Sequence, residues 1–89
     1  MLEQEIKIIN KLGLHARASA KLVSTASRFE SHIEVAFGQQ TADAKSIMSI
    51  MMLAASVGST VTVRTNGNDK QAAMDAVTKL INNYFDEDE

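Results

Sequence analysis

Residues 13–17, Gly13-Leu14-His15-Ala16-Arg17, join two segments whose hydrophobic residues recur with different periods. Leu2 to Ile9 alternates between two faces, which is typical of a strand with one buried face. Ala16 to Phe29 instead has Leu22, Ala26 and Phe29 at helical spacing. We therefore expect a strand, a loop that contains the glycine, and a helix that begins beside the histidine.

His15 then lies where the first backbone N–H groups of a helix lack intrahelical partners. Those groups and the positive end of the helix dipole form a site for an anion. Arg17 adds a fixed positive charge and a planar set of donors that suits phosphate oxygens. The residue types thus predict a phosphoryl group held on imidazole. The alternative is a surface or capping histidine beside an ordinary solvated arginine.

The rest of the chain repeats these two patterns. Period-two alternation predicts strands over 31–37 and 60–65, and a turn at Gly38-Gln39 predicts a hairpin that pairs the first of these with a weaker strand over 40–44. A short helix is predicted from Ile47 to about Leu53, and a longer one from Lys70 to Phe85 with Ala73, Val77, Leu80, Ile81 and Tyr84 on its buried face. The order β-α-β-β-α-β-α predicts an α+β open-faced two-layer β-sandwich, a four-stranded antiparallel sheet with three helices on one face.

The short helix is apolar nearly all round. If Ile50, Leu53 and Ala54 face the core, then Ile47, Met48 and Met51 share an outward face. An exposed apolar patch that contains methionine is typical of a binding surface. The alternative is a fully buried helix. Small residues after His15, Ala20 among them, would let a partner approach the histidine closely.

Composition excludes several classes of protein. The 89 residues suffice for one domain over 1–89, and the absence of cysteine excludes disulfides and thiolate metal sites, which is consistent with the cytoplasm. No apolar run approaches the ~18 residues of a membrane span, and no signal segment opens the chain. A net charge of −2 and 4% aromatic residues argue against a nucleic-acid binder, as do Glu3, Glu5 and Glu34 on the expected open face of the sheet.

Two further predictions concern charged residues. The acidic run Asp86–Glu89 is expected to be a frayed, solvated tail. His32 falls on the polar side of its strand, and no third ligand accompanies it and His15, so we expect no metal site. The carboxylates and histidines are expected to form no close catalytic cluster.

Two segments carry a resemblance to a known family. Asn10-Lys11-Leu12-Gly13-Leu14-His15-Ala16-Arg17 resembles the active-site segment of the HPr phosphocarriers of the bacterial phosphotransferase system, and Lys45-Ser46-Ile47-Met48-Ser49-Ile50-Met51 resembles the segment around their regulatory serine. Length, the Gly58 turn and the strand-then-helix ending also fit. The family usually has proline after the arginine; here Ala18 leaves the first helical turn less rigid.

The resemblance implies the first and fourth strands as neighbours in the sheet, and a function. His15 would take a phosphoryl group on Nδ1, held by Arg17 and the N–H groups of Ala16, Arg17 and Ala18, and the protein would be a carrier without cofactor and not a turnover enzyme. The donor would be enzyme I or its nitrogen-branch paralogue, and the acceptor an enzyme IIA-type domain. The docking residues would be Leu14, Ala20, Ile47, Met48 and Met51. We expect a cytoplasmic monomer, either HPr or its nitrogen-regulatory paralogue NPr.

Ser46 occupies an N-cap position before the short helix, so one expected role is structural. By resemblance it is also a site for an HPr kinase/phosphorylase. A phosphate there would suit the helix dipole but place negative charge beside the apolar patch.

Another class of function stays open at this point. A small acyl-phosphate hydrolase, or another anion-binding α+β domain, could also use the anion site and the arginine. A hydrolase would need a residue that positions water, and no candidate stands out in the sequence.

Overall fold

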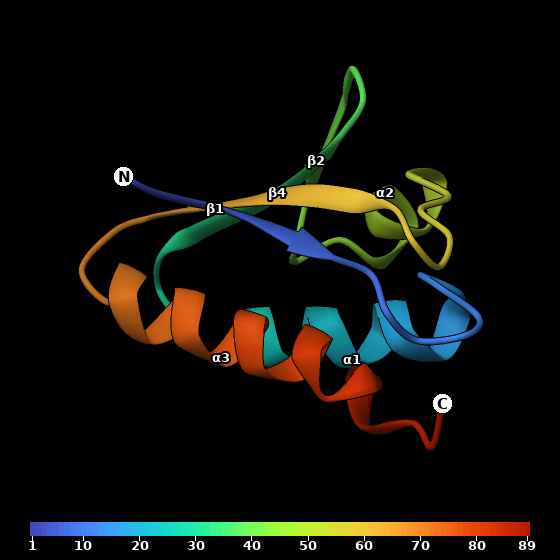
Figure 1. The fold of residues 1–89 in the computed structure, drawn as a ribbon. Coiled ribbons are helices and arrows are strands. Elements are labelled where there is room, and N and C mark those ends of the chain that lie inside the picture. Colours follow the sequence, from blue (N-terminus) through green and yellow to red (C-terminus); the bar gives the residue numbers. More distant parts are fainter.

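A computed structural model describes the whole chain, residues 1–89 (Figure 1). The elements follow the predicted order, with one additional 3-10 turn near the C-terminus. They are β1 (Leu2–Lys7), α1 (Ala16–Ala26), β2 (His32–Phe37), β3 (Gln40–Asp43), α2 (Ile47–Met52), β4 (Thr60–Asn66), α3 (Lys70–Asn82) and η1 (Tyr84–Asp86). None of the helices is both long enough and apolar enough to cross a membrane.

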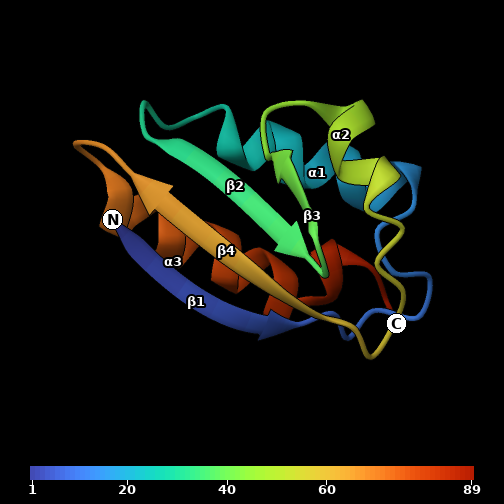
Figure 2. The same ribbon diagram turned by 90° about the horizontal axis from the view of Figure 1, so that it is seen from above.

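The four strands form one antiparallel sheet in the order β1-β4-β2-β3, so the first and fourth strands are neighbours. Helices α1 and α3 lie side by side beneath one face of this sheet, and the other face is open (Figures 1 and 2). On the open face Arg64 pairs with Glu3 at 2.6 Å and with Glu34 at 3.5 Å. The open-faced α+β sandwich is therefore confirmed.

The alternating strands place their apolar residues in the core as predicted. Twenty-one buried hydrophobic residues form one cluster, including Ile33, Val35, Val61 and Val63 of the sheet. The helices complete it from below, since all of the expected α3 positions up to Ile81 are buried. His32 is exposed on the polar side of β2, also as predicted.

Helix α2 presents the expected apolar patch. Ile50 and Leu53 face the core with 0% and 5% exposure, whereas Ile47, Met48 and Met51 remain 38%, 65% and 37% exposed. The helix is thus not fully buried, and we call these three side chains the α2 patch.

The prediction for Ala54 is wrong. The helix ends at Met52, and Ala54 adopts a left-handed φ of 54°. This reversal turns Ala54 outward and buries Ala55 instead.

Two helices end earlier than predicted. Helix α1 stops at Ala26 and not at Phe29, after Ser24 and Thr25, residue types with modest helix propensity. Helix α3 stops at Asn82, and Tyr84, Phe85 and Asp86 follow with left-handed φ values of 59°, 53° and 62°. Because of this turn Tyr84 is 40% exposed and Phe85 takes the buried position, so the prediction that Tyr84 continues the buried face is wrong.

Candidate functional site

His15 is the N-cap residue of α1, so the helix begins where the sequence predicts. Its Nδ1 accepts a long hydrogen bond of 3.4 Å from the backbone N–H of Arg17, and its carbonyl oxygen accepts from Ser19 N–H at 2.9 Å. The N–H groups of Ala16 and Ala18 have no acceptor within the chain. Nδ1 therefore lies beside unpaired donors at the positive end of the helix, where a phosphoryl group would be stabilised.

The loop before His15 is fixed to the connection between α2 and β4. Leu14 N–H donates to the Ala55 carbonyl at 2.9 Å, and Gly13 approaches the same segment so closely that a Cβ atom would lie 2.6 Å from the Ala55 oxygen. Gly13 also has a left-handed φ of 65°, which glycine adopts without steric cost. This loop thus requires glycine for two separate reasons.

Leu14 does not belong to the docking surface predicted for it. Its side chain is only 5% exposed and packs in the core, because the loop turns it inward beneath Ala55. Ala20, by contrast, is exposed on α1.

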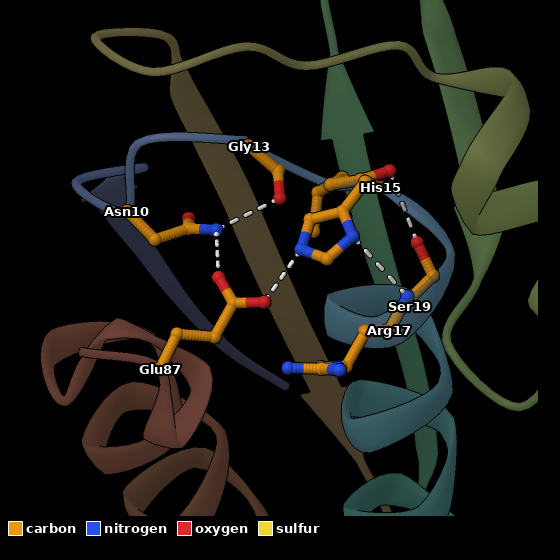
Figure 3. A network of polar contacts seen from close by, with 7 residues as sticks. Asn10, Gly13, His15, Arg17, Ser19 and Glu87 are labelled. Carbon is orange, nitrogen blue, oxygen red and sulfur yellow. Dashed lines mark hydrogen bonds and ion pairs between the residues drawn. The ribbon is translucent and has the colours of Figure 1, made fainter. Parts of the chain in front are cut away.

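Arg17 is exposed in the first turn of α1, and its guanidinium extends past the imidazole toward the C-terminal segment (Figure 3). It borders a hollow of about 400 Å³, lined otherwise by Lys11, Leu12 and residues 86–89. The hollow thus contains two basic side chains, which can bind phosphate oxygens, and four acidic residues.

The C-terminal segment reaches His15, which the sequence analysis did not anticipate. Glu87 Oε2 lies 2.5 Å from His15 Nε2, and Glu87 Oε1 accepts from Asn10 Nδ2 at 3.0 Å (Figure 3). The same Asn10 nitrogen donates to the Gly13 carbonyl at 2.9 Å. The expectation of a solvated tail is therefore wrong at Glu87, whose side chain is only 10% exposed, and so is the expectation that no carboxylate clusters with a histidine.

Burial of Phe85 explains why this segment is ordered despite its charge. Phe85 is fully buried, and full burial of such a side chain contributes about 1.5–3 kcal/mol. Backbone hydrogen bonds from Asp86 and Glu87 to Asn83 and Tyr84 close the turn. The outer ion pairs, Lys21–Asp86 and Lys11–Glu89 at 3.6 Å, are solvent-exposed and contribute little.

The surroundings of Glu87 favour its ionised form. Desolvation alone would raise the pKa of this carboxyl group, but hydrogen bonds from Asn10 and His15, with the nearby charges of His15 and Arg17, outweigh it and lower the pKa below its ordinary value. Glu87 is therefore a carboxylate at neutral pH.

The remaining predicted residues lie apart from the imidazole. Ser46 is the N-cap of α2, where its side chain accepts from Ser49 N–H at 3.4 Å, and α2 packs beside α1. The start of α1, helix α2 and the C-terminal segment lie at the same end of the molecule (Figures 1 and 2). His32 lies 3.7 Å from Glu34 and takes no part in the site. The structure contains no group of three or more metal-ligating side chains of the His, Cys, Asp or Glu type.

Sequence reasoning missed Asn10 and Glu87 as site residues. Asn10 belongs to the segment that carries the family resemblance, but nothing in the pattern indicated that its amide would be fully buried. The available signal for Glu87 was Phe85, a large apolar residue immediately before the acidic run.

The comparisons with known proteins agree with this geometry. The family model described as PTS HPr component phosphorylation site matches residues 2–83. Phosphocarrier protein HPr of Cupriavidus necator is 56% identical over 89 residues, the whole of both chains, and phosphocarrier protein NPr of Shewanella violacea is 43% identical over 86 residues, 97% of this chain and 94% of that one. A crystal structure of HPr-C-His from Thermoanaerobacter tengcongensis covers all of both chains with a TM-score of 0.96 and 44% identity.

Nothing in these comparisons supports the hydrolase or a general anion-binding domain as the function. The matches extend over the segments around both His15 and Ser46, because they span essentially the whole chain. The chain belongs to the HPr family, the phosphocarrier proteins of the phosphotransferase system.

Proposed function

We propose that His15 accepts a phosphoryl group on Nδ1 from phosphorylated enzyme I, or its nitrogen-branch paralogue, and passes it to an enzyme IIA-type domain. The observation that carries this proposal is the position of Nδ1 beside the unpaired N–H groups at the start of α1. Phosphoryl transfer needs mainly positioning and charge neutralisation, and this site supplies both.

The site residues divide the task between backbone and side chain. The N–H groups of Ala16, Arg17 and Ala18 face the oxygens of a phosphoryl group at Nδ1, and the Arg17 guanidinium neutralises part of its charge. No residue is assigned to activate water, and the protein acts as a carrier over residues 1–89 and not as a turnover enzyme. It needs no cofactor, because the donor brings the activated phosphoryl group.

The α2 patch and Ala20 form the docking surface for both partners. Ile47, Met48 and Met51 are exposed on α2, which packs beside α1. Ala20 is exposed on α1, and its small side chain leaves room for a partner to approach His15. Flexible methionine side chains suit a surface that meets more than one partner. We place the protein in the cytoplasm as a monomer, in either the sugar or the nitrogen-regulatory branch.

Ser46 is proposed as a regulatory site for an HPr kinase/phosphorylase. It is half-buried at the N-cap of α2, directly before the patch. A phosphate there would add about −1.5 to −2 charges beside Ile47 and Met48 without opposing the helix dipole. Partners with acidic rims would then bind less well.

The proposal is tested by labelling with radioactive phosphoenolpyruvate and each type of enzyme I. We expect an acid-labile phosphate on the wild type and on His32→Ala, the matched control for loss of a histidine, and none on His15→Ala. Labelling of His15→Ala to the wild-type level would refute the assignment. Comparison of the two enzyme I types would also identify the branch.

A further inference from the structure

The carboxylate of Glu87 is held in a defined orientation against the histidine. One oxygen lies 2.5 Å from His15 Nε2, and the other accepts from Asn10 Nδ2 at 3.0 Å. Asn10 is fully buried and is itself tied to the Gly13 carbonyl at 2.9 Å. Both oxygens of the carboxylate are thus held by residues of the loop that carries the histidine.

The backbone of the C-terminal segment is shaped to place this group. Tyr84, Phe85 and Asp86 all take left-handed conformations, which non-glycine residues rarely adopt in succession. The fully buried Phe85 holds the turn in place. Strain of this kind, maintained by the surrounding packing, is characteristic of functional sites.

The contact determines which ring nitrogen carries the proton. A carboxylate accepts hydrogen bonds only, so at neutral pH Nε2 must be the protonated nitrogen in the contact with Glu87. Nδ1 accepts from Arg17 N–H and therefore carries a lone pair. This is the tautomer that an attack by Nδ1 requires.

We propose that Glu87 is a positioning residue for phosphoryl transfer, because its carboxylate binds the Nε2–H of His15 and fixes the tautomer in which Nδ1 is the nucleophile. This inference rests on the proposed function of His15. In the transfer the Nδ1 lone pair forms the bond to phosphorus while the bond from phosphorus to the donor atom breaks, and that electron pair returns to the donor. Nε2 keeps its proton throughout, so the ring becomes cationic.

The carboxylate then lies against a positive ring, in the arrangement by which the aspartate of a serine-protease triad stabilises its imidazolium. Other charged groups border the same hollow: the basic residues Lys11 and Arg17, and the acidic residues Asp86, Asp88 and Glu89. No side chain among these groups forms a hydrogen bond or ion pair with His15, which distinguishes Glu87 from its acidic neighbours.

The test compares Glu87→Gln with Glu89→Gln, which removes the same charge from the same segment without touching the imidazole. Nitrogen-15 NMR of the ring at neutral pH reports the tautomer, and rapid-mixing kinetics report transfer from phosphorylated enzyme I. We expect Glu87→Gln to lose the single Nε2–H tautomer and to slow transfer about tenfold, with KM for enzyme I unchanged. The tenfold figure is the low end of the cost of removing the orienting partner of a metal-binding histidine, taken here as a guide to the same hydrogen bond without a metal. Glu89→Gln should match the wild type in both measurements.

Each outcome distinguishes this inference from the function on which it rests. If Glu87→Gln is labelled on His15 and its ring tautomer and transfer rate match those of the wild type, the role of Glu87 is overturned and the function of His15 stands. Faster transfer in that variant would also overturn it, since the segment would then obstruct the histidine. Failure of wild-type His15 to become labelled would refute the proposed function itself. Glu87→Asp, which keeps the charge but shortens the side chain, should recover the rate only in part.

Discussion

Substitution of Gly13 by alanine tests whether the loop before His15 is fixed by its contact with the α2–β4 connection. Two costs are expected. A left-handed φ of 65° costs alanine about 1–2 kcal/mol. The new Cβ would also lie 2.6 Å from the Ala55 carbonyl oxygen and 2.9 Å from Ser56 Cα, and these backbone atoms cannot move without disturbing the Leu14–Ala55 hydrogen bond. Such overpacking costs typically about 1–3 kcal/mol, so we expect a total loss of roughly 2–5 kcal/mol.

Gly38→Ala is the matched control, because Gly38 has nearly the same φ, 62°, but a Cβ atom added there would have no neighbouring atom within 4 Å. Urea denaturation should show a loss of only about 1–2 kcal/mol for this variant. The difference of about 1–3 kcal/mol between the variants isolates the contact with Ala55 and Ser56. Phosphoryl transfer should slow only in Gly13→Ala, since that loop positions His15. Equal losses of stability in the two variants would refute the reasoning.

Four further predictions concern the site and its surroundings. Arg17→Ala should slow transfer about 100-fold in rapid-mixing assays without loss of stability, and Arg17→Lys should recover only part because the planar fork of donors is lost; equal rates would show that the backbone N–H groups suffice. Met48→Glu should raise KM for enzyme I about tenfold while the free energy of unfolding changes by less than about 0.5 kcal/mol, and a loss of several kcal/mol would place Met48 in the core. Ser46→Asp should raise KM more than Ser46→Asn, which caps equally well, and more at low than at high salt; identical effects of the two variants would contradict an electrostatic mechanism. Because the folded-state pKa of Glu87 is lowered, its contacts contribute stability above the ordinary glutamate pKa of 4.5, and this contribution is lost as pH falls through the lower folded value. Acid titration should thus destabilise the wild type more than Glu87→Gln, and parallel curves would contradict the pKa shift.

Local patterns were enough to predict most of the fold and the part of the site that His15 and Arg17 form at the start of α1. Alternation identified three of the strands, the turn at Gly38-Gln39 indicated β3, and the change of period at Gly13-Leu14-His15 located the start of α1. The apolar character of α2 also predicted its outward patch, because a short helix on a sheet can bury only one stripe. These features depend on residues that are neighbours in the sequence.

The contact of Glu87 with His15 could not be predicted in this way. It joins residues 72 positions apart and depends on a left-handed turn that the residue types of Tyr84 and Phe85 do not favour. Acidic residues near a chain end are normally solvated, and here the burial of Phe85 determines the outcome instead. Ala54 was misplaced because α2 ends at Met52 and its period no longer applies, and Leu14 because it lies in a loop, where no period indicates which way a side chain points.

The central claim is that Nδ1 of His15 carries the phosphoryl group beside the unpaired N–H groups at the start of α1. The most direct measurement is NMR of the nitrogen-15-labelled protein phosphorylated by enzyme I, with detection of one-bond coupling between phosphorus and a ring nitrogen. We expect coupling to His15 Nδ1, together with downfield shifts of the Ala16 and Ala18 amide protons as they bind the phosphoryl oxygens. Coupling to Nε2, to either nitrogen of His32, or to no histidine would contradict the account.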